Sequence, residues 1–250
     1  MNYLIAENTE EMGYIAADIF AKQIQRKPDC VLGLATGSTP VPLYAELVRR
    51  CKTGKADFSR VRSVNLDEYV GLGMEHPQSY RYFMQQHLFD HINIDPVNTC
   101  LPDGLAKDIP AACNEYDKLI VGWGGIDLQL LGIGHNGHIG FNEPGTVFTL
   151  KTHMVDIAER TRLANARFFE NDPEKVPKQA ITMGIGNIMG ARKIVLLVSG
   201  ESKAEILRRS LTEDVTPAVP ASVLQLHPDL TVIADREAAA LIETVYAAVL

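Results

Sequence analysis

A regular alternation of short apolar runs with longer helical patterns is the feature that most constrains the fold of this chain. The run Ile194–Val198 is apolar at every position, which is typical of a parallel strand that helices cover on both faces. Helical patterns separate the successive runs, so we predict an α/β fold: a Rossmann-like, open, mostly parallel sheet with helices on both faces, in three layers. The expected strands are Val31–Ala35, Val61–Leu66, Leu128–Leu131, Ile194–Val198 and Leu230–Ala234. The expected helices are Glu10–Arg26, Pro40–Lys52, Ser79–His87, Ala111–Val121, Ser202–Leu211 and Arg236–Val249.

Composition and charge exclude several classes of protein. With 46% hydrophobic and 22% charged residues, the chain is typical of a globular protein. No apolar run approaches the ~18 residues that span a bilayer, and the N-terminus lacks the basic and apolar parts of a signal peptide. We therefore expect a cytoplasmic protein without a membrane partner. The net charge of −7 gives nucleic acid no general electrostatic reason to bind, so an anionic small molecule would need a local basic pocket.

The organisation of the chain is simple. It has no internal repeat, low-complexity segment or flexible linker, so we expect a single domain over residues 1–250. Its four cysteines lie far apart and form no CxxC pair, which favours reduced thiols over a disulfide framework or a zinc cage.

Three segments indicate a phosphate site, because ligands of open α/β sheets bind at the carboxyl ends of the strands. The first expected strand ends in small and hydroxyl residues before Pro40, and Thr39 is the expected N-cap of the next helix. Lys203 follows another strand and a Ser-Gly pair, and three arginines occur within residues 160–167. Solvated surface cations and a tight turn are the structural alternatives. The candidate phosphate ligands are Ala35, Thr36, Gly37, Ser38, Thr39, Arg167 and Lys203.

Two adjacent acids, Asp67 and Glu68, follow the second expected strand directly. Beside a phosphate pocket, one of them is a candidate general acid or base. Strand-end carboxylates also serve as helix caps, and periodicity leaves open which of the two faces the cleft.

The glycine-rich stretch Gly132–Gly145 has three possible functions. It resembles a dinucleotide fingerprint, but the glycines and Pro144 that follow would break the helix that such a fingerprint needs. His135 and His138 lie on a loop and not four residues apart on a helix, which argues against a metal site. The third function is proton transfer by His138, supported by Glu143 and by Asn136 or His135. A histidine that satisfies buried carbonyls is the structural alternative.

Several motifs together resemble the glucosamine-6-phosphate deaminase family. They are Asn65–Leu72 (NLDEYVGL), Gly132–Pro144 (GIGHNGHIGFNEP), Thr161–Phe169 (TRLANARFF), Leu34–Pro40 (LATGSTP), His76–Tyr80 (HPQSY) and Leu224–His227 (LQLH), and they extend over nearly the whole chain.

The resemblance implies a fold of the deaminase/ribose-5-phosphate isomerase type. It implies conversion of D-glucosamine 6-phosphate and water to D-fructose 6-phosphate and ammonia, with no metal and no cofactor. Asp67 would shuttle the proton between C2 and C1 of the sugar, and His138, with Glu143, would open the pyranose ring. Arg167, Lys203 and the loop from Ala35 to Thr39 would hold the phosphate.

Two departures from the family pattern qualify these expectations. Some members have aspartate where this chain has Asn136, whose amide orients the histidine without carrying charge. Hexameric members that are activated by N-acetylglucosamine 6-phosphate carry basic residues shortly after the Asn-Glu-Pro motif, whereas this chain has residues 153–156, His-Met-Val-Asp. We therefore expect no allosteric activation, and a monomer or small homo-oligomer.

Two alternative functions remain open, and one segment is expected to move. The alternatives are 6-phosphogluconolactonase, which resembles this fold and also binds a sugar phosphate, and a non-catalytic sugar-phosphate sensor domain. The segment Arg162–Pro177 mixes a helical pattern with breakers and carries a phosphate ligand, so we expect it to act as a lid.

Overall fold

A computed structural model describes residues 1–145 and 147–242 of the chain. Its main feature is a seven-stranded sheet in the order β1-β10-β9-β6-β2-β3-β5, in which all neighbouring strands are parallel. The strands are β1 Asn2–Ala6, β2 Val31–Leu34, β3 Arg62–Asn65, β5 Thr99–Cys100, β6 Leu128–Leu131, β9 Ile194–Val198 and β10 Leu230–Asp235. The predicted fold class is confirmed.

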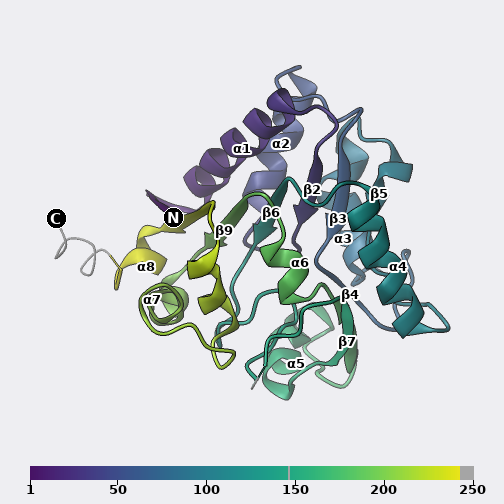
Figure 1. Cartoon of the computed structure of the whole chain (residues 1–250), viewed down its shortest axis with the longest axis vertical. Coiled ribbons are helices and arrows are strands. Elements are labelled where there is room, and N and C mark those ends of the chain that lie inside the picture. Colours follow the sequence, from purple (N-terminus) through teal and green to yellow (C-terminus); the bar gives the residue numbers. More distant parts are fainter. Residues whose placement is uncertain (146, 243–250) are drawn as a thin grey trace.

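Helices cover the sheet (Figure 1). They are α1 Thr9–Arg26, α2 Val41–Lys52, α3 Tyr80–His87, α4 Ile109–Gly122, α5 Glu159–Asn165, α6 Ile185–Met189, α7 Ala204–Thr212 and α8 Arg236–Ala239. Strands β2, β6 and β9 are buried at every position because helices pack on both faces of the sheet. The side chains of these strands form the centre of the hydrophobic core.

A second, antiparallel sheet contains β4 Asp67–Tyr69, β8 Gln179–Thr182 and β7 His153–Asp156. In Figure 1, β4 and β7 lie with α5 below the large sheet. These strands were not predicted, because they are short and β7 alternates between half-buried and exposed side chains without an apolar run. The small sheet matters for function because its first residue is Asp67, paired with Thr182.

The order of the strands identifies one crevice as the place for a ligand. From β2 the chain proceeds to β3 and β5 on one side, whereas from β6 it proceeds to β9 and β10 on the other side. The carboxyl ends of β2 and β6 therefore form a topological switch point, where open α/β sheets bind their ligands. The loops that leave these two ends are Ala35–Thr39 and Gly132–Gly145.

Two predictions about individual elements need correction, and one strand was missed. Thr39 is not a helix cap: α2 begins at Val41, and its N-cap is Pro40, which has no side chain that can accept a hydrogen bond. The predicted helix Arg236–Val249 is helical over Arg236–Ala239, and residues 243–250 lie outside the described part of the chain. The edge strand β1 was not predicted, because its side chains are mostly exposed and include no continuous buried run.

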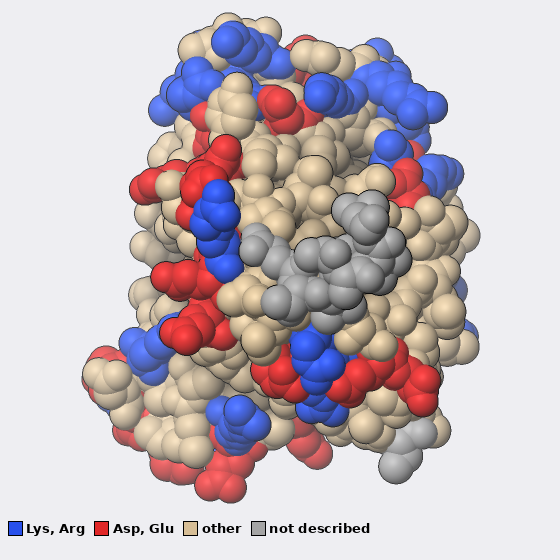
Figure 2. Space-filling model, turned by 90° about the vertical axis from the view of Figure 1, so that its left-hand side faces the viewer, with Lys and Arg blue, Asp and Glu red and all other residues tan. Residues whose placement is uncertain are grey.

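The surface of the molecule carries mixed charge on the face shown in Figure 2, where basic side chains gather at the top and acidic ones dominate the lower part. Among the described residues, no helix is both long and apolar enough to cross a membrane.

Candidate active site

The loop Gly132–Gly145 contacts both halves of the predicted site. Near its start, the carbonyl oxygen of Ile133 accepts a hydrogen bond from Lys203 Nζ at 2.8 Å. Further along, the loop passes so close to β4 that a Cβ atom on Gly140 would lie 3.4 Å from Asp67 Oδ2. One loop therefore reaches both Lys203 and Asp67, and it carries the two histidines between these contacts.

The glycines of this loop have steric roles that differ from those of a dinucleotide fingerprint. A Cβ atom on Gly134 would lie 2.2 Å from Cε1 of His138, so only glycine allows the imidazole to pack against the backbone there. Gly137 and Gly140 adopt φ angles of 86° and 58°, which favour glycine. The segment folds back on itself, with an isolated bridge between Ile139 and Asn142, and does not open a helix.

Glu143 is held on both of its carboxylate oxygens. Oε1 accepts a hydrogen bond from Thr161 Oγ1 at 2.5 Å, and Oε2 accepts one from Asn136 Nδ2 at 2.6 Å. His138 Nδ1 lies 3.4 Å from Oε2. Burial by itself raises the pKa of Glu143, but the contacts with His138, Thr161 and Asn136 outweigh it and lower the pKa to about 2. Glu143 is therefore a fixed anion beside the imidazole.

Asn136 connects Glu143 to His138 more closely than the sequence suggested. Its Nδ2 donates to Glu143, and its Oδ1 accepts a hydrogen bond from the backbone N–H of His138 at 3.2 Å. A carboxylate at position 136 could not donate to Glu143. The amide thus makes a contact that aspartate would replace with repulsion.

Asp67 and Glu68 point in different directions, which resolves the alternative that the sequence left open. Glu68 accepts hydrogen bonds from the backbone N–H groups of Tyr69, Tyr80 and Arg81 at 2.8–2.9 Å, so it caps the start of α3. Asp67 makes no side-chain hydrogen bond with any described residue and is 7% exposed. Burial, and then the charge of Glu68, raise the pKa of Asp67 to about 8. Its carboxyl group is available to a substrate, and its pKa is close to neutral.

An aromatic cluster packs around Tyr69, which lies two residues after Asp67 on β4. Tyr69 packs against Tyr80, Phe141 and Phe169, with ring centroids 4.9–5.7 Å apart. Asn165 of α5 donates a hydrogen bond to the Tyr69 hydroxyl at 2.9 Å, so α5 is docked on the same cluster.

A cation cluster, defined here as Lys203, Arg167 and Arg160, lies at the other end of the crevice. Burial lowers the pKa of Lys203, and the positive charges of Arg167 and Arg160 lower it further, to about 8. None of the three forms an ion pair with an acidic side chain in the part of the chain that the structure describes. Unpaired, mutually repelling cations are stabilised when an anion binds among them.

His135 belongs beside this cation cluster and not beside Glu143. Its Nε2 lies 3.3 Å from the Ser202 hydroxyl. Its pKa is lowered, first by burial and then by the charges of Lys203 and Arg160. Of the two residues that the sequence offered as support for His138, Asn136 is therefore the one in contact.

The loop Ala35–Thr39 can add backbone donors to the same end. The Tyr44 hydroxyl donates a hydrogen bond to the Ala35 carbonyl at 2.5 Å and fixes the start of the loop. Gly37 has a φ of 102°. Among the described residues, no hydrogen bond uses the backbone N–H groups of residues 36–39. Free N–H groups at the end of a strand form an anion-binding nest.

Two site residues, Arg160 and Thr161, were not among the predicted ones. The cluster of three arginines was noticed in the sequence, but only the structure separates them: Arg162 donates to the Pro173 carbonyl at 2.7 Å and pairs with Glu174, away from Lys203. Thr161 begins one of the motifs noticed in the sequence, but the motif does not indicate its contact with Glu143, which joins helix α5 to a separate loop. The predicted lid over Arg162–Pro177 stays a prediction.

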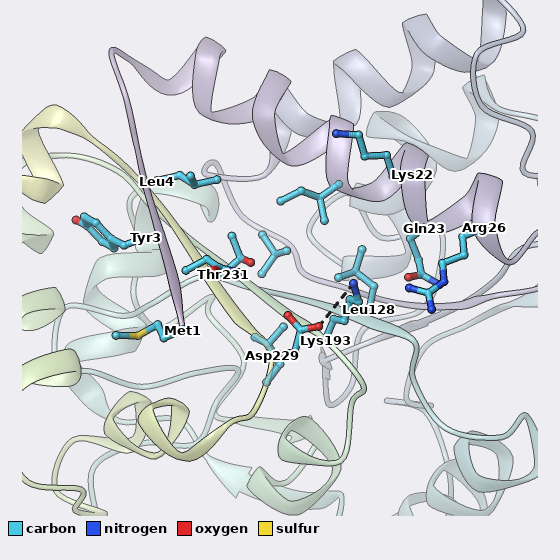
Figure 3. A pocket seen from close by; sticks show the side chains of 14 residues that line it. Met1, Tyr3, Leu4, Lys22, Gln23, Arg26, Leu128, Lys193, Asp229 and Thr231 are labelled. Carbon is cyan, nitrogen blue, oxygen red and sulfur yellow. Dashed lines mark ion pairs between the residues drawn. The ribbon is translucent and has the colours of Figure 1, made fainter.

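The opposite edge of the sheet has a hollow of about 680 Å³, at the amino ends of β1, β6, β9 and β10. Figure 3 shows the ion pair between Lys193 and Asp229 inside it, with Lys22, Gln23 and Arg26 of α1 nearby. Its described lining includes no histidine, and its one carboxylate, Asp229, is paired with Lys193. Among the described residues, no three metal-binding side chains lie together.

Comparisons with known proteins show the family of the chain. Residues 6–233 match the family model of glucosamine-6-phosphate isomerases and 6-phosphogluconolactonases. A glucosamine-6-phosphate deaminase from Clostridium perfringens (strain 13 / Type A) is 52% identical over 243 residues, which cover 97% of this chain and 100% of the relative. One from Clostridium tetani is 56% identical over 239 residues, which cover 96% of this chain and 99% of the relative.

Solved structures give the same result. A structure described as a monomeric glucosamine-6-phosphate deaminase superposes with a TM-score of 0.94 at 48% identity, covering 96% of this chain and 100% of that one. A 6-phosphogluconolactonase from Trypanosoma cruzi has a TM-score of 0.74 at 18% identity, covering 96% of each chain, and shares the fold. The resemblance found from the motifs is confirmed, and the chain belongs to the glucosamine-6-phosphate deaminase family.

Proposed function

We propose that this chain converts D-glucosamine 6-phosphate and water to D-fructose 6-phosphate and ammonia. One observation carries the proposal: the single loop Gly132–Gly145 contacts an unpaired buried carboxyl group, Asp67, and an unpaired cation, Lys203, and itself carries the carboxylate-supported imidazole of His138. A phosphorylated aldose needs these three groups for ring opening, proton transfer and anchoring.

The cation cluster and the loop Ala35–Thr39 bind the phosphate. The bound dianion offsets the repulsion among Lys203, Arg167 and Arg160, and the backbone N–H groups of residues 36–39 donate to its oxygens. The phosphate lies far from the bonds that change, so these contacts orient the sugar without taking part in the reaction.

His138 opens the pyranose ring. The imidazole takes the proton of the anomeric hydroxyl and delivers a proton to the ring oxygen, which breaks the C1–O5 bond and leaves an aldehyde at C1. Glu143, an anion fixed by Thr161 and Asn136, stabilises the imidazole while it carries the extra proton.

Asp67 then moves a proton from C2 to C1. Its carboxylate removes the C2 proton, the electron pair forms the C1–C2 double bond, and the aldehyde oxygen takes a proton from the substrate's own C2 ammonium group to give an enolamine. Return of the proton to C1 leaves a C2 imine. Water adds to the imine carbon and ammonia leaves, which completes the ketose. A pKa of about 8 suits this task, because a carboxyl group that both removes and returns a proton is most effective when its pKa is close to the operating pH.

The proposal extends to the setting of the enzyme. We propose that it acts in the cytoplasm, as a monomer or small homo-oligomer, without an allosteric activator. In support of the last point, residues 153–156 contain no lysine or arginine that would bind an anionic effector.

A pair of assays tests the function. The purified chain is given glucosamine 6-phosphate, with ammonia and fructose 6-phosphate measured by coupled enzymes, and 6-phosphogluconolactone, with hydrolysis followed by proton release. We expect stoichiometric ammonia and fructose 6-phosphate from the first substrate and no acceleration of the second. Acceleration of lactone hydrolysis without ammonia release would overturn the proposal in favour of a lactonase.

A further inference from the structure

Helix α5 contacts three separate parts of the crevice, although it is only seven residues long. Arg160 belongs to the cation cluster. Thr161, the next residue, donates its hydroxyl proton to Glu143. Asn165 donates to the hydroxyl of Tyr69, which is two residues from Asp67. One short helix thus touches the phosphate end, the ring-opening pair and the wall beside the proton shuttle.

The contact of Thr161 with Glu143 is specific in its geometry. A threonine hydroxyl in a helix commonly bonds back to the carbonyl one turn earlier. The Thr161 hydroxyl instead leaves the helix and meets Glu143 Oε1 at 2.5 Å, and the residue is 7% exposed. Its neighbour Arg160 is exposed. The two adjacent side chains therefore diverge, one toward the carboxylate and one toward the phosphate end.

Thr161 binds the oxygen of Glu143 that the other partners of this carboxylate do not contact. Asn136 and His138 both meet Oε2, and both lie on the same loop as Glu143. Thr161 is the partner of Oε1, and it comes from a different segment. Without it, the carboxylate would be held from one side and by its own loop alone, so it could rotate away from the imidazole.

We propose that Thr161 is a positioning residue, which holds Glu143 against His138 and makes that hold depend on phosphate bound at the adjacent Arg160. The inference rests on the proposed function, because it assigns the phosphate end and the ring-opening pair to one substrate. Phosphate that binds Arg160 near the start of α5 and Arg167 in the 3-10 helix Ala166–Phe168 directly after it restrains α5 from both sides. The Thr161 hydroxyl then restrains Glu143 in turn.

Steady-state kinetics on glucosamine 6-phosphate give the first test. Thr161→Val removes the hydroxyl at nearly constant volume, and Thr161→Ser retains it. Since a hydrogen bond to a charged group contributes on the order of a tenfold to hundredfold effect, we expect kcat to fall by roughly tenfold or more in Thr161→Val, with KM changed by less than about threefold. Thr161→Ser should stay within about threefold of the wild type in both constants. Thr212→Val, which removes an exposed helical threonine hydroxyl on α7, is the matched control and should behave as wild type.

A nuclear magnetic resonance experiment tests the transmission without turnover. Inorganic phosphate is titrated into the wild type while the ring signals of His138 are followed, with His138→Gln for assignment. We expect phosphate to shift the His138 signals in the wild type and in Thr161→Ser. In Thr161→Val phosphate should still bind, as measured by calorimetry, but leave those signals almost unchanged.

The outcomes separate this inference from the proposed function. If the wild type releases no ammonia, the function fails, but the phosphate titration still tests the coupling. If the wild type is active and Thr161→Val keeps its kcat, or if phosphate shifts His138 equally in Thr161→Val, the positioning role is wrong. A loss of kcat in Thr161→Ser as large as in Thr161→Val would also overturn it, because the hydroxyl would then not be the cause.

Discussion

The two ends of the crevice differ in how their charges are compensated. At the ring-opening end, Glu143 has a donor on each oxygen and an imidazole beside it, all from the protein. At the phosphate end, Lys203, Arg167 and Arg160 have no acidic partner among the described residues, and the charges of the two arginines lower the pKa of Lys203. Glu143 has a pKa lowered to about 2, whereas Lys203 has a pKa lowered to about 8 by burial and by like charge.

The difference shows which groups are organised before the substrate arrives. A fully satisfied carboxylate is already in its working state, as electrostatic catalysis requires. In an uncompensated cation cluster, the repulsion between the positive charges is offset only when an anion binds, so this repulsion favours binding. Asp67 resembles the cation cluster, because it is buried without a hydrogen-bond partner and gains one only from the substrate.

The largest effect should come from removing the charge of Asp67. Asp67→Asn is expected to lower kcat by at least about 100-fold, the usual scale for a general acid–base group. Ring opening should persist, because His138 is untouched, and it can be followed as anomer interconversion by exchange spectroscopy. Near-normal ammonia release by this variant would show that Asp67 is not the proton shuttle.

The ring-opening end should respond differently. His138→Gln is expected to lower kcat by at least about 100-fold when the substrate is the closed sugar. The small fraction of substrate that is already in the open-chain form should still react quickly in this variant. Rapid mixing should show this reaction as a burst of ammonia. An equal loss with closed and open-chain substrate would place His138 in a later step.

The phosphate end should affect binding more than chemistry. Arg167→Ala and Arg160→Ala are each expected to raise KM for glucosamine 6-phosphate by roughly tenfold, with a smaller change in kcat, since a charged hydrogen bond contributes about 1.5–3 kcal/mol. Arg162→Ala is the matched control, because Arg162 contacts Pro173 and Glu174 instead. If all three variants had the same KM, the structural separation of these arginines would be wrong.

The pH dependence of phosphate binding follows from Lys203. Its pKa is lowered to about 8, so it loses its charge as the pH rises through that value. The affinity for inorganic phosphate, measured by calorimetry, should therefore fall between pH 7 and pH 9, by several-fold. In Lys203→Met the affinity should be weak and should change little over that range. A wild-type affinity that rises with pH would contradict the assignment.

The two carboxylates should also change stability, and with opposite signs. The folded-state pKa of Asp67 is about 8, above the value of about 3.9 in an unfolded chain. Its contribution to stability is therefore full below about pH 4 and is lost as the pH rises toward 8, by at most about 1.4 kcal/mol per unit. Asp67→Asn should gain stability relative to the wild type over this range, measured by denaturant unfolding.

Glu143 should show the reverse. Its folded-state pKa of about 2 lies below its unfolded value, so its contribution is present at neutral pH and is lost as the pH falls through about 2. Glu143→Gln should therefore be less stable than the wild type at neutral pH. If both variants changed stability in the same direction, the two carboxylates would be compensated alike, which would contradict this comparison.

The sequence predicted the elements whose side chains are buried on both faces. Strands β6 and β9 were predicted with their observed bounds, because continuous apolar character leaves little choice. The small antiparallel sheet was missed, because three-residue β4 and the alternating β7 have no such signal.

The motifs identified five candidate site residues but not the contacts that these residues make. The five are Asp67, His138, Glu143, Arg167 and Lys203. The choice between Asp67 and Glu68 depended on which one the start of α3 approaches, and this is a tertiary property. Thr161 and Arg160 were missed for the same reason: their partners are distant in sequence. The donors on Glu143 show that Asn136 is suited to its place, which could not be deduced from its uncharged side chain alone.

A crystal structure of the chain with D-fructose 6-phosphate tests most directly whether one crevice seats both ends of the sugar phosphate. We predict that the phosphate oxygens lie within hydrogen-bond distance of Lys203 Nζ, the Arg167 guanidinium and the backbone N–H groups of residues 36–39, with C1 and C2 facing the Asp67 carboxyl group. A phosphate seated elsewhere, such as the hollow between Lys22, Arg26 and Lys193, or a sugar whose C1 and C2 face away from Asp67, would contradict the account.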